Sequence, residues 1–212
     1  MNINYHKLCL EEISKLDKPK NILLHSCCAP CSSYVITFLS NYFNITVIYY
    51  NPNIYPQEEY EKRKQEQIRL IRSLKTKNKL DFLDCDYDND LYNELIKGYE
   101  QELEGGSRCH ICFKLRLEKT AKLAKEHNYD YFSSTLTVSP HKNSKIINEI
   151  GETLGKEYNI QWLYSDFKKN EGFKQSIELS KKYDLYRQDY CGCIYSQRIK
   201  EKQEIWFLVL FC

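Results

Sequence analysis

Short apolar runs alternate along this chain with longer segments of helical character, and this alternation limits the fold more than any other feature. Runs rich in β-branched and aromatic residues predict strands at 21–26, 45–50, 82–85, 129–136 and 160–164. Helical spacing and the lack of breakers predict helices at 32–40, 57–77, 109–127, 145–154 and 173–183. Strands that alternate with helices favour a three-layer, Rossmann-like α/β domain with a mostly parallel sheet.

The chain has 212 residues and no internal repeat, low-complexity segment or convincing linker, so we expect one α/β catalytic domain over 1–212. No run approaches the roughly 18 apolar residues of a membrane span, and the first 19 residues carry charges where a signal peptide would be apolar. We therefore expect a cytoplasmic protein without a membrane partner. The apolar tail at 205–212 predicts a packed strand or sheet edge.

An open parallel sheet binds its ligands beyond the carboxyl ends of its strands. The first group of cysteines follows the first predicted strand and falls at that end, which predicts a cysteine-rich metal site there. The chain contains neither GxGxxG nor GxxxxGK[ST], and it has only seven glycines. Nothing in its loops therefore predicts a nucleotide-phosphate site.

Seven of the ten cysteines fall into three groups, at 27–31, 109–112 and 191–193. The other three are expected to be small buried hydrophobic residues: Cys9, Cys85 and Cys212. Because the chain shows no export signal, structural disulfides are not expected, and the grouped cysteines indicate metal or redox chemistry.

The pair Cys109 and Cys112 opens a predicted helix, where the helix dipole and backbone N–H groups favour thiolates. Cys27 and Cys28 are adjacent and can converge on one metal site only in a strand-to-turn conformation. Together the two pairs supply four thiolates, a set that fits structural zinc or an iron–sulfur cluster. Packing or redox thiols are a third alternative.

The remaining grouped cysteines have other possible roles. Cys191 and Cys193 are separated by one glycine, so they could form a strained, reducible disulfide or act as two further metal ligands. Cys31 is left over and could bind a second metal ion.

Polar and aromatic residues beside the cysteine groups are weaker candidates. His25 and His110 could ligate metal, shuttle protons or serve as hydrogen-bonded neighbours. Arg116 lies on the face of Cys112 and could hold an RNA phosphate or be a solvated surface charge. Tyr190 could stack on an unpaired base or fill the core.

Charge is distributed unevenly. Residues 58–79 include eight basic and four acidic side chains, whereas residues 81–104 include nine acidic and one basic. Nucleic acid could approach the first segment and would be repelled by the second.

Five ordered motifs resemble the QueH-type epoxyqueuosine reductase family. The resemblance covers residues from about 21 to 196, and the motifs are LLHSCCAPCS, YNPNIYP, EGGSRCHICFKLRLEKTA, SSTLTVSPHKN and LYRQDYCGCIYS. It implies a bacterial enzyme that performs the last step of queuosine biosynthesis. Such an enzyme removes the epoxide oxygen of epoxyqueuosine at the wobble position of tRNA, with electrons from an external low-potential donor.

The resemblance also implies cofactors, ligands and a fold. A 4Fe-4S cluster would be held by Cys27, Cys28, Cys109 and Cys112. Cys191 and Cys193 would form the redox-active pair, and an additional iron is expected near the cluster, with Cys31 as its candidate ligand. The implied fold resembles the nucleotide α-hydrolase group. The turn Ser-Cys-Cys-Ala-Pro at 26–30 replaces the Gly-rich turn of its phosphate-binding members, which argues against ATP chemistry.

Two other functions are open alternatives. A cluster-dependent tRNA sulfur transferase would require ATP, and a non-catalytic zinc-stabilised RNA-binding module would leave residues 191–193 without a role. For a reductase, the proton donor is open among His25, Asp189 and Tyr190.

Overall fold

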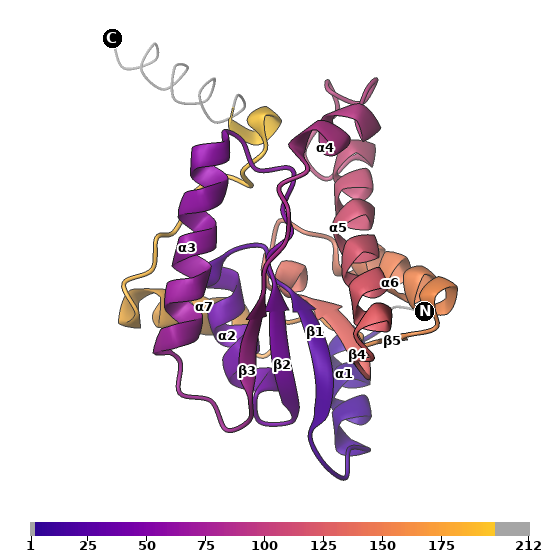
Figure 1. Cartoon of the computed structure of the whole chain (residues 1–212), viewed down its shortest axis with the longest axis vertical. Helices are drawn as coiled ribbons and strands as arrows, with labels where there is room; N and C mark the ends of the chain where they lie inside the picture. The colour runs from indigo at the N-terminus through magenta and orange to yellow at the C-terminus, as the bar shows by residue number, and fades with distance from the viewer. Residues whose placement is uncertain (1–2, 198–212) are drawn as a thin grey trace.

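The computed structural model describes residues 3–197, which build one five-stranded sheet with helices on both faces (Figure 1). All pairings are parallel, in the order β3-β2-β1-β4-β5. The strands are β1 (Lys20–His25), β2 (Phe43–Ile48), β3 (Leu80–Leu83), β4 (Tyr131–Ser134) and β5 (Gln161–Trp162). The predicted three-layer, Rossmann-like α/β fold is thus confirmed. The tail at 205–212, predicted as a strand or edge, lies outside the described residues.

Seven α-helices and one short 3-10 helix accompany these strands within residues 3–197. They are α1 (Tyr5–Ser14), α2 (Ala29–Leu39), α3 (Gln57–Ser73), α4 (Asn89–Leu95), α5 (Ser107–Glu126), η1 (Thr135–Val138), α6 (Ser144–Tyr158) and α7 (Gly172–Lys182). The sequence does not predict α1 or α4. It also predicts one strand over 129–136, whereas β4 ends at Ser134. The Ser134 side chain accepts a hydrogen bond from the Leu136 N–H at 3.2 Å, and this residue is the N-cap of η1.

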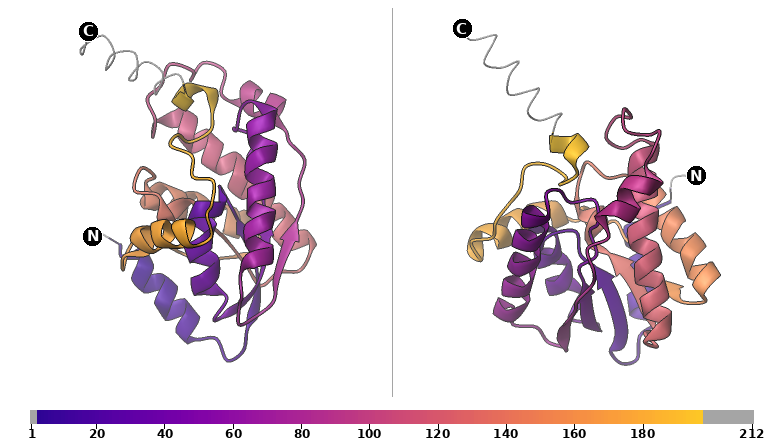
Figure 2. Two further views of the ribbon diagram at one scale, coloured as in Figure 1. Left: turned by 90° about the vertical axis from the view of Figure 1, so that its left-hand side faces the viewer. Right: turned by 45° about the horizontal axis from the view of Figure 1, so that its top comes forward.

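The two faces of the sheet are covered by different helices because side chains alternate along each strand. Ile22 and Leu24 of β1 lie in a core with α1, α2 and α7, whereas Leu23 lies in a second core with α5 and α6. The segment after α7 returns along α3 toward the end of the molecule where α5 begins (Figure 2). Within residues 3–197, no helix is long and apolar enough to cross a membrane.

Candidate functional site

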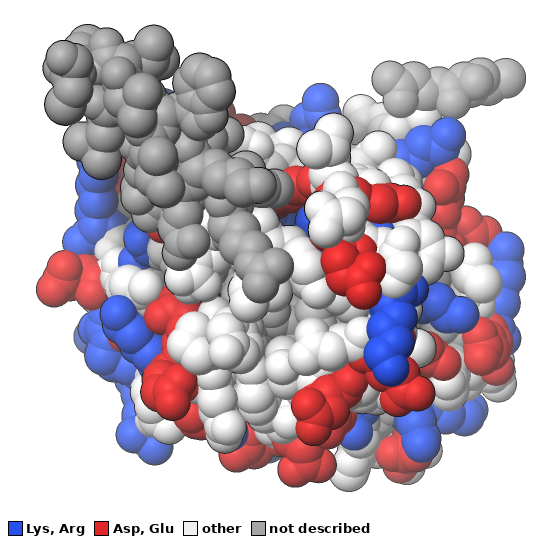
Figure 3. Space-filling model, turned by 90° about the horizontal axis from the view of Figure 1, so that it is seen from above, with Lys and Arg blue, Asp and Glu red and all other residues white. Residues whose placement is uncertain are grey.

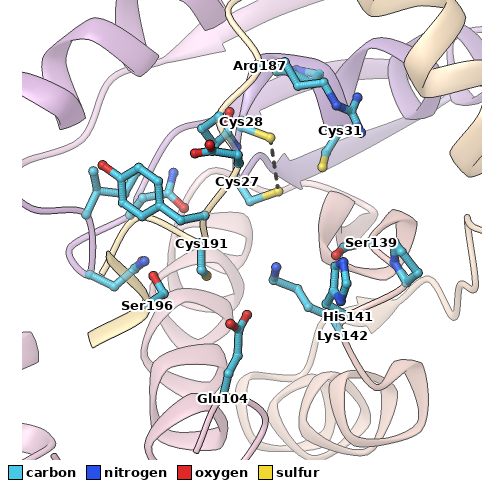
Figure 4. Close-up of a pocket in the computed structure, with 18 of the residues that line it drawn as sticks. Cys27, Cys28, Cys31, Glu104, Ser139, His141, Lys142, Arg187, Cys191 and Ser196 are labelled. Atoms are coloured by element: carbon cyan, nitrogen blue, oxygen red, sulfur yellow. Dashed lines mark hydrogen bonds between the residues drawn. The ribbon is translucent and has the colours of Figure 1, made fainter. Parts of the chain in front are cut away.

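A pocket of about 620 Å³ lies at the carboxyl ends of the central strands (Figure 4). The turns after β1 and β2 and the loop after η1 line it together with the segment that follows α7, through residues within 27–31, 51–54, 139–142 and 187–191. Seen from above in Figure 3, the described residues at this end of the molecule include both basic and acidic side chains. The pocket therefore lies at the end of the sheet where the sequence predicts a site.

Three cysteines converge at one wall of this pocket. The sulfur atoms of Cys27, Cys28 and Cys31 all lie within 4.8 Å of one another. Cys28 is the extended N-cap of α2, and Pro30 fixes the first turn of that helix. Because β1 ends at His25 and α2 begins at Ala29, both adjacent cysteines lie in the turn between strand and helix. This is the strand-to-turn geometry that convergence requires, and three sulfur atoms so close together could bind one metal ion.

Hydrogen bonds within this triad favour a thiolate at Cys27. The pKa of Cys27 lies well below its ordinary value, chiefly because the Cys28 and Cys31 thiols hydrogen-bond to its sulfur, although burial opposes the shift. The same interaction raises the pKa of Cys28 to about 12. Thr135, at the start of η1, accepts a hydrogen bond from the Cys27 N–H at 3.1 Å and donates one to Cys27 Sγ at 3.4 Å.

The second predicted pair lies in the first two turns of α5, outside the close triad. Cys109 Sγ accepts a hydrogen bond from the Gly105 N–H at 3.2 Å. Cys112 is buried beside Cys193 and Tyr92, and burial raises its pKa to about 12. Among residues 3–197, the close group contains Cys27, Cys28 and Cys31, but neither cysteine of α5.

Cys191 and Cys193 point to different surroundings. Cys191 lines the pocket together with the triad, as Figure 4 shows. Cys193 is buried and accepts a hydrogen bond at Sγ from the Ser196 N–H at 3.4 Å. Both are free thiols in this structure, so their predicted redox pairing is not formed here.

Arg116 lines the pocket but is buried, with only 2% of its surface exposed. The surface-charge alternative for this residue is therefore wrong. Arg116 Nε donates a hydrogen bond to the Cys112 carbonyl at 3.1 Å, and Nη1 donates one to Asn51 Oδ1 at 3.3 Å. The third nitrogen, Nη2, has no hydrogen-bond partner in the part of the chain described. Burial lowers the pKa of the guanidinium, but the thiols of Cys112, Cys191 and Cys27 more than offset this and raise it.

Lys142 supplies a second cationic group, and Figure 4 shows its amine pointing into the pocket. Burial lowers the pKa of this amine, but the surrounding thiols of Cys191, Cys27 and Cys31 raise it above its ordinary value. The pocket therefore combines a cysteine-rich wall with two cations that lie close to its sulfur atoms.

Of the other candidate site residues from the sequence, two line the pocket and two do not. Tyr190 and Asp189 line the pocket, whereas His25 and His110 do not. His25 is buried between Ser134 Oγ at 2.9 Å and the Tyr50 carbonyl at 3.1 Å, and burial lowers its pKa to about 3. It is thus a hydrogen-bonded neighbour.

Several lining residues were not predicted as site residues, although they lie within the quoted motifs. They include Asn51, Asn53, Glu104 and Lys142. The motif YNPNIYP, which follows β2 at the same end of the sheet as the cysteines, was the signal that could have identified the two asparagines.

Residues 22–199 match the family description "Epoxyqueuosine reductase QueH". A protein of that name from Streptococcus pyogenes is 43% identical over 204 residues, which cover 93% of this chain and 80% of the relative. The Staphylococcus epidermidis protein of the same name is 44% identical over 202 residues, covering 92% and 84%. The Thermotoga maritima protein so named is 33% identical over 175 residues, covering 82% and 89%. This chain belongs to the epoxyqueuosine reductase QueH family.

Proposed function

We propose that this protein reduces epoxyqueuosine to queuosine at the wobble position of tRNA, in the last step of queuosine biosynthesis. Opening the epoxide to an alkene consumes two electrons and two protons and releases the oxygen as water. The observation that carries the proposal is the pocket, in a chain of this family, which is lined by the close triad Cys27, Cys28 and Cys31 and also by Cys191. Its tRNA substrate would place the enzyme in the cytoplasm, with an external low-potential electron donor.

The residues present fit an anionic metal–sulfur group. Arg116 is buried and makes no ion pair with a carboxylate among the described residues, and its strongest attractive neighbours are thiols. An uncompensated buried charge is costly, and thiolates bound to metal would compensate it. We propose that Cys27, Cys28, Cys109 and Cys112 hold a 4Fe-4S cluster and that Cys31 contributes to an additional iron. When bound, a cluster supplies electrons one at a time from the external donor.

For the reaction itself, we propose that the pocket holds the epoxide between the triad and Cys191. The Lys142 amine points into this space and can donate a hydrogen bond to the oxygen that leaves. Tyr190 and Asp189 are the candidate proton donors that line the pocket, and the buried His25 no longer fits that role. Cys191 and Cys193 would release two electrons and two protons on closing to a disulfide, which the external donor would then reduce.

The proposal is tested with protein prepared without oxygen. We expect about four iron and four sulfide per chain for the cluster, a fifth iron when the additional site is filled, broad absorption near 400 nm, and reduction of epoxyqueuosine in tRNA. Cys191→Ser should abolish turnover and leave the cluster content nearly intact. Loss of the cluster in that variant would make Cys191 a ligand and refute its redox role. Stoichiometric zinc without sulfide, persisting after attempted cluster reconstitution, would favour the RNA-binding module instead.

A further inference from the structure

The turn at residues 51–54, which follows β2, is held rigidly at the edge of the pocket. The Ile54 N–H donates to the Asn51 carbonyl at 3.1 Å and closes the turn. From outside the turn, Asn89 Nδ2 donates to the Pro52 carbonyl at 2.7 Å, and the Tyr87 hydroxyl donates to the Ile54 carbonyl at 2.5 Å. Side chains on this turn are therefore presented in a fixed position.

One of those side chains has no hydrogen bond within the described chain. Asn53 is only 2% exposed and lines the pocket, yet its Oδ1 is buried without a partner among residues 3–197. Asn51, two residues earlier, differs because its amide donates to the Ser26 carbonyl at 2.8 Å and accepts from Arg116 at 3.3 Å. A buried amide oxygen without a partner destabilises the folded chain, so its retention here calls for a role beyond folding.

A second amide in the same pocket has the same property. Oε1 of Gln188, on the segment after α7, is buried and has no hydrogen-bond partner in the described part of the chain. Two amide side chains, each with a buried carbonyl oxygen that has no hydrogen-bond partner among residues 3–197, thus line a pocket that Cys27, Cys28 and Cys31 also line. Oxygen acceptors are satisfied only by donors, so the group that enters must carry hydroxyl or N–H groups close to the bond that is reduced.

We propose that Asn53 Oδ1 accepts a hydrogen bond from a hydroxyl or N–H group of the epoxide-bearing modification and thereby selects the modified nucleoside. This inference rests on the proposed function and adds a specificity-determining residue to it. A site built to hydrogen-bond a substrate rejects an analogue that lacks the donor, because the buried acceptor is then left unpaired. An unmodified guanosine at the wobble position would lack this partner.

The test compares two RNA stem-loops, one carrying epoxyqueuosine and one carrying guanosine at the wobble position. Asn53→Leu keeps a similar volume and removes the amide. We expect it to raise the Kd for the epoxyqueuosine stem-loop about tenfold and leave the Kd for the guanosine stem-loop unchanged. In turnover, KM should rise more than kcat falls. Asn44→Leu, at the amino end of the same strand and outside the pocket, is the matched control and should leave both Kd values unchanged.

A structural role for Asn53 predicts different results. Because its Oδ1 has no hydrogen-bond partner to lose among residues 3–197, Asn53→Leu should unfold at the same Tm as the parent protein or a higher one. A lower Tm with equal weakening for both stem-loops would overturn the inference. If the parent protein prefers and reduces epoxyqueuosine RNA but Asn53→Leu keeps the full preference, this inference fails alone. If the cluster-loaded parent neither prefers nor reduces it, the proposed function fails as well.

Discussion

At the scale of single residues, a hydroxyl group holds the sulfur that begins the triad. Thr135 is fully buried and both accepts from the Cys27 N–H and donates to Cys27 Sγ. Hydrogen bonds to cluster sulfurs also influence reduction potential. A single buried hydroxyl therefore fixes the backbone and the side chain of one proposed ligand.

Thr135→Val should show what this hydroxyl contributes. It leaves the part-buried Cys27 N–H without this acceptor, so we expect the free energy of unfolding to fall by about 1 kcal/mol. A bound cluster should also become harder to reduce. Urea unfolding and a redox titration measure the two effects, and Thr135→Ser should preserve both values. If Thr135→Val matched the parent protein in both measurements, the positioning role would be refuted.

The buried charge of Arg116 leads to a prediction about metal removal. The charge lacks a carboxylate partner among the described residues, so bound anionic metal thiolates should stabilise the folded state through it. We expect removal of iron by a chelator to lower the Tm of the parent protein more than that of Arg116→Met. The metal-free variant should unfold at a higher Tm than the metal-free parent. Equal drops in Tm, measured by calorimetry, would contradict this coupling.

Residue types in the sequence identified as candidates the four cysteines that line the pocket, but not the residues that support them. Grouped cysteines stand out because their chemistry is specialised and their spacing is local. Thr135 contacts Cys27 from 108 positions away in the sequence. The lack of a hydrogen-bond partner for Asn53 Oδ1 within residues 3–197 depends on the surrounding fold. Arg116 was placed on the correct helix face, yet its burial depends on packing that one helix does not reveal.

At the scale of elements, α3 fixes the segment that carries Cys191. Arg69 donates to the carbonyls of Tyr183 and Asp184 at 3.0 and 2.8 Å, and Arg63 donates to the Cys191 carbonyl at 3.3 Å. These contacts extend along the helix, so the segment is held at several points. The orientation of Cys191 toward the pocket is a consequence of this attachment.

Gly192→Ala should loosen that attachment. Gly192 has φ +113°, and an added Cβ would lie 2.8 Å from Arg63 Nη1 and 3.1 Å from Ile54 Cγ1. Both the backbone strain and the contact disfavour alanine. We expect faster hydrogen exchange in residues 186–193, unchanged exchange in β1, and a loss of most turnover. Unchanged exchange and turnover would show that the loop accommodates a side chain.

The elements themselves were predicted well where their apolar pattern is long. All five strands and the helices α2, α3, α5, α6 and α7 were predicted, with differences at their ends. The missed α4 has only seven residues, too few to show a clear helical period. The strand predicted over 129–136 is too long because β-branched residues continue past Ser134. In the structure the Ser134 side chain caps η1, so the strand ends there.

At the scale of the whole molecule, sheet order explains why distant motifs meet. β1 is central, with β2 and β4 on either side, so the segments that follow these strands open at one end of the sheet. The alternation of strands and helices in the sequence predicted that the site lies at this end of the sheet. It did not predict that the chain after α7 returns along α3, as Figure 2 shows. That return brings Cys191 into the pocket that Cys27 also lines.

The most direct measurement is a single-turnover reaction without oxygen, using cluster-loaded protein, a chemical reductant and tRNA that carries epoxyqueuosine. The tRNA is then digested to nucleosides, which are separated and identified by their masses in mass spectrometry. The account predicts that epoxyqueuosine loses the mass of one oxygen atom and becomes queuosine, without ATP. Unchanged epoxyqueuosine, with protein that holds its full iron and sulfide, would contradict the central claim that this pocket reduces the epoxide.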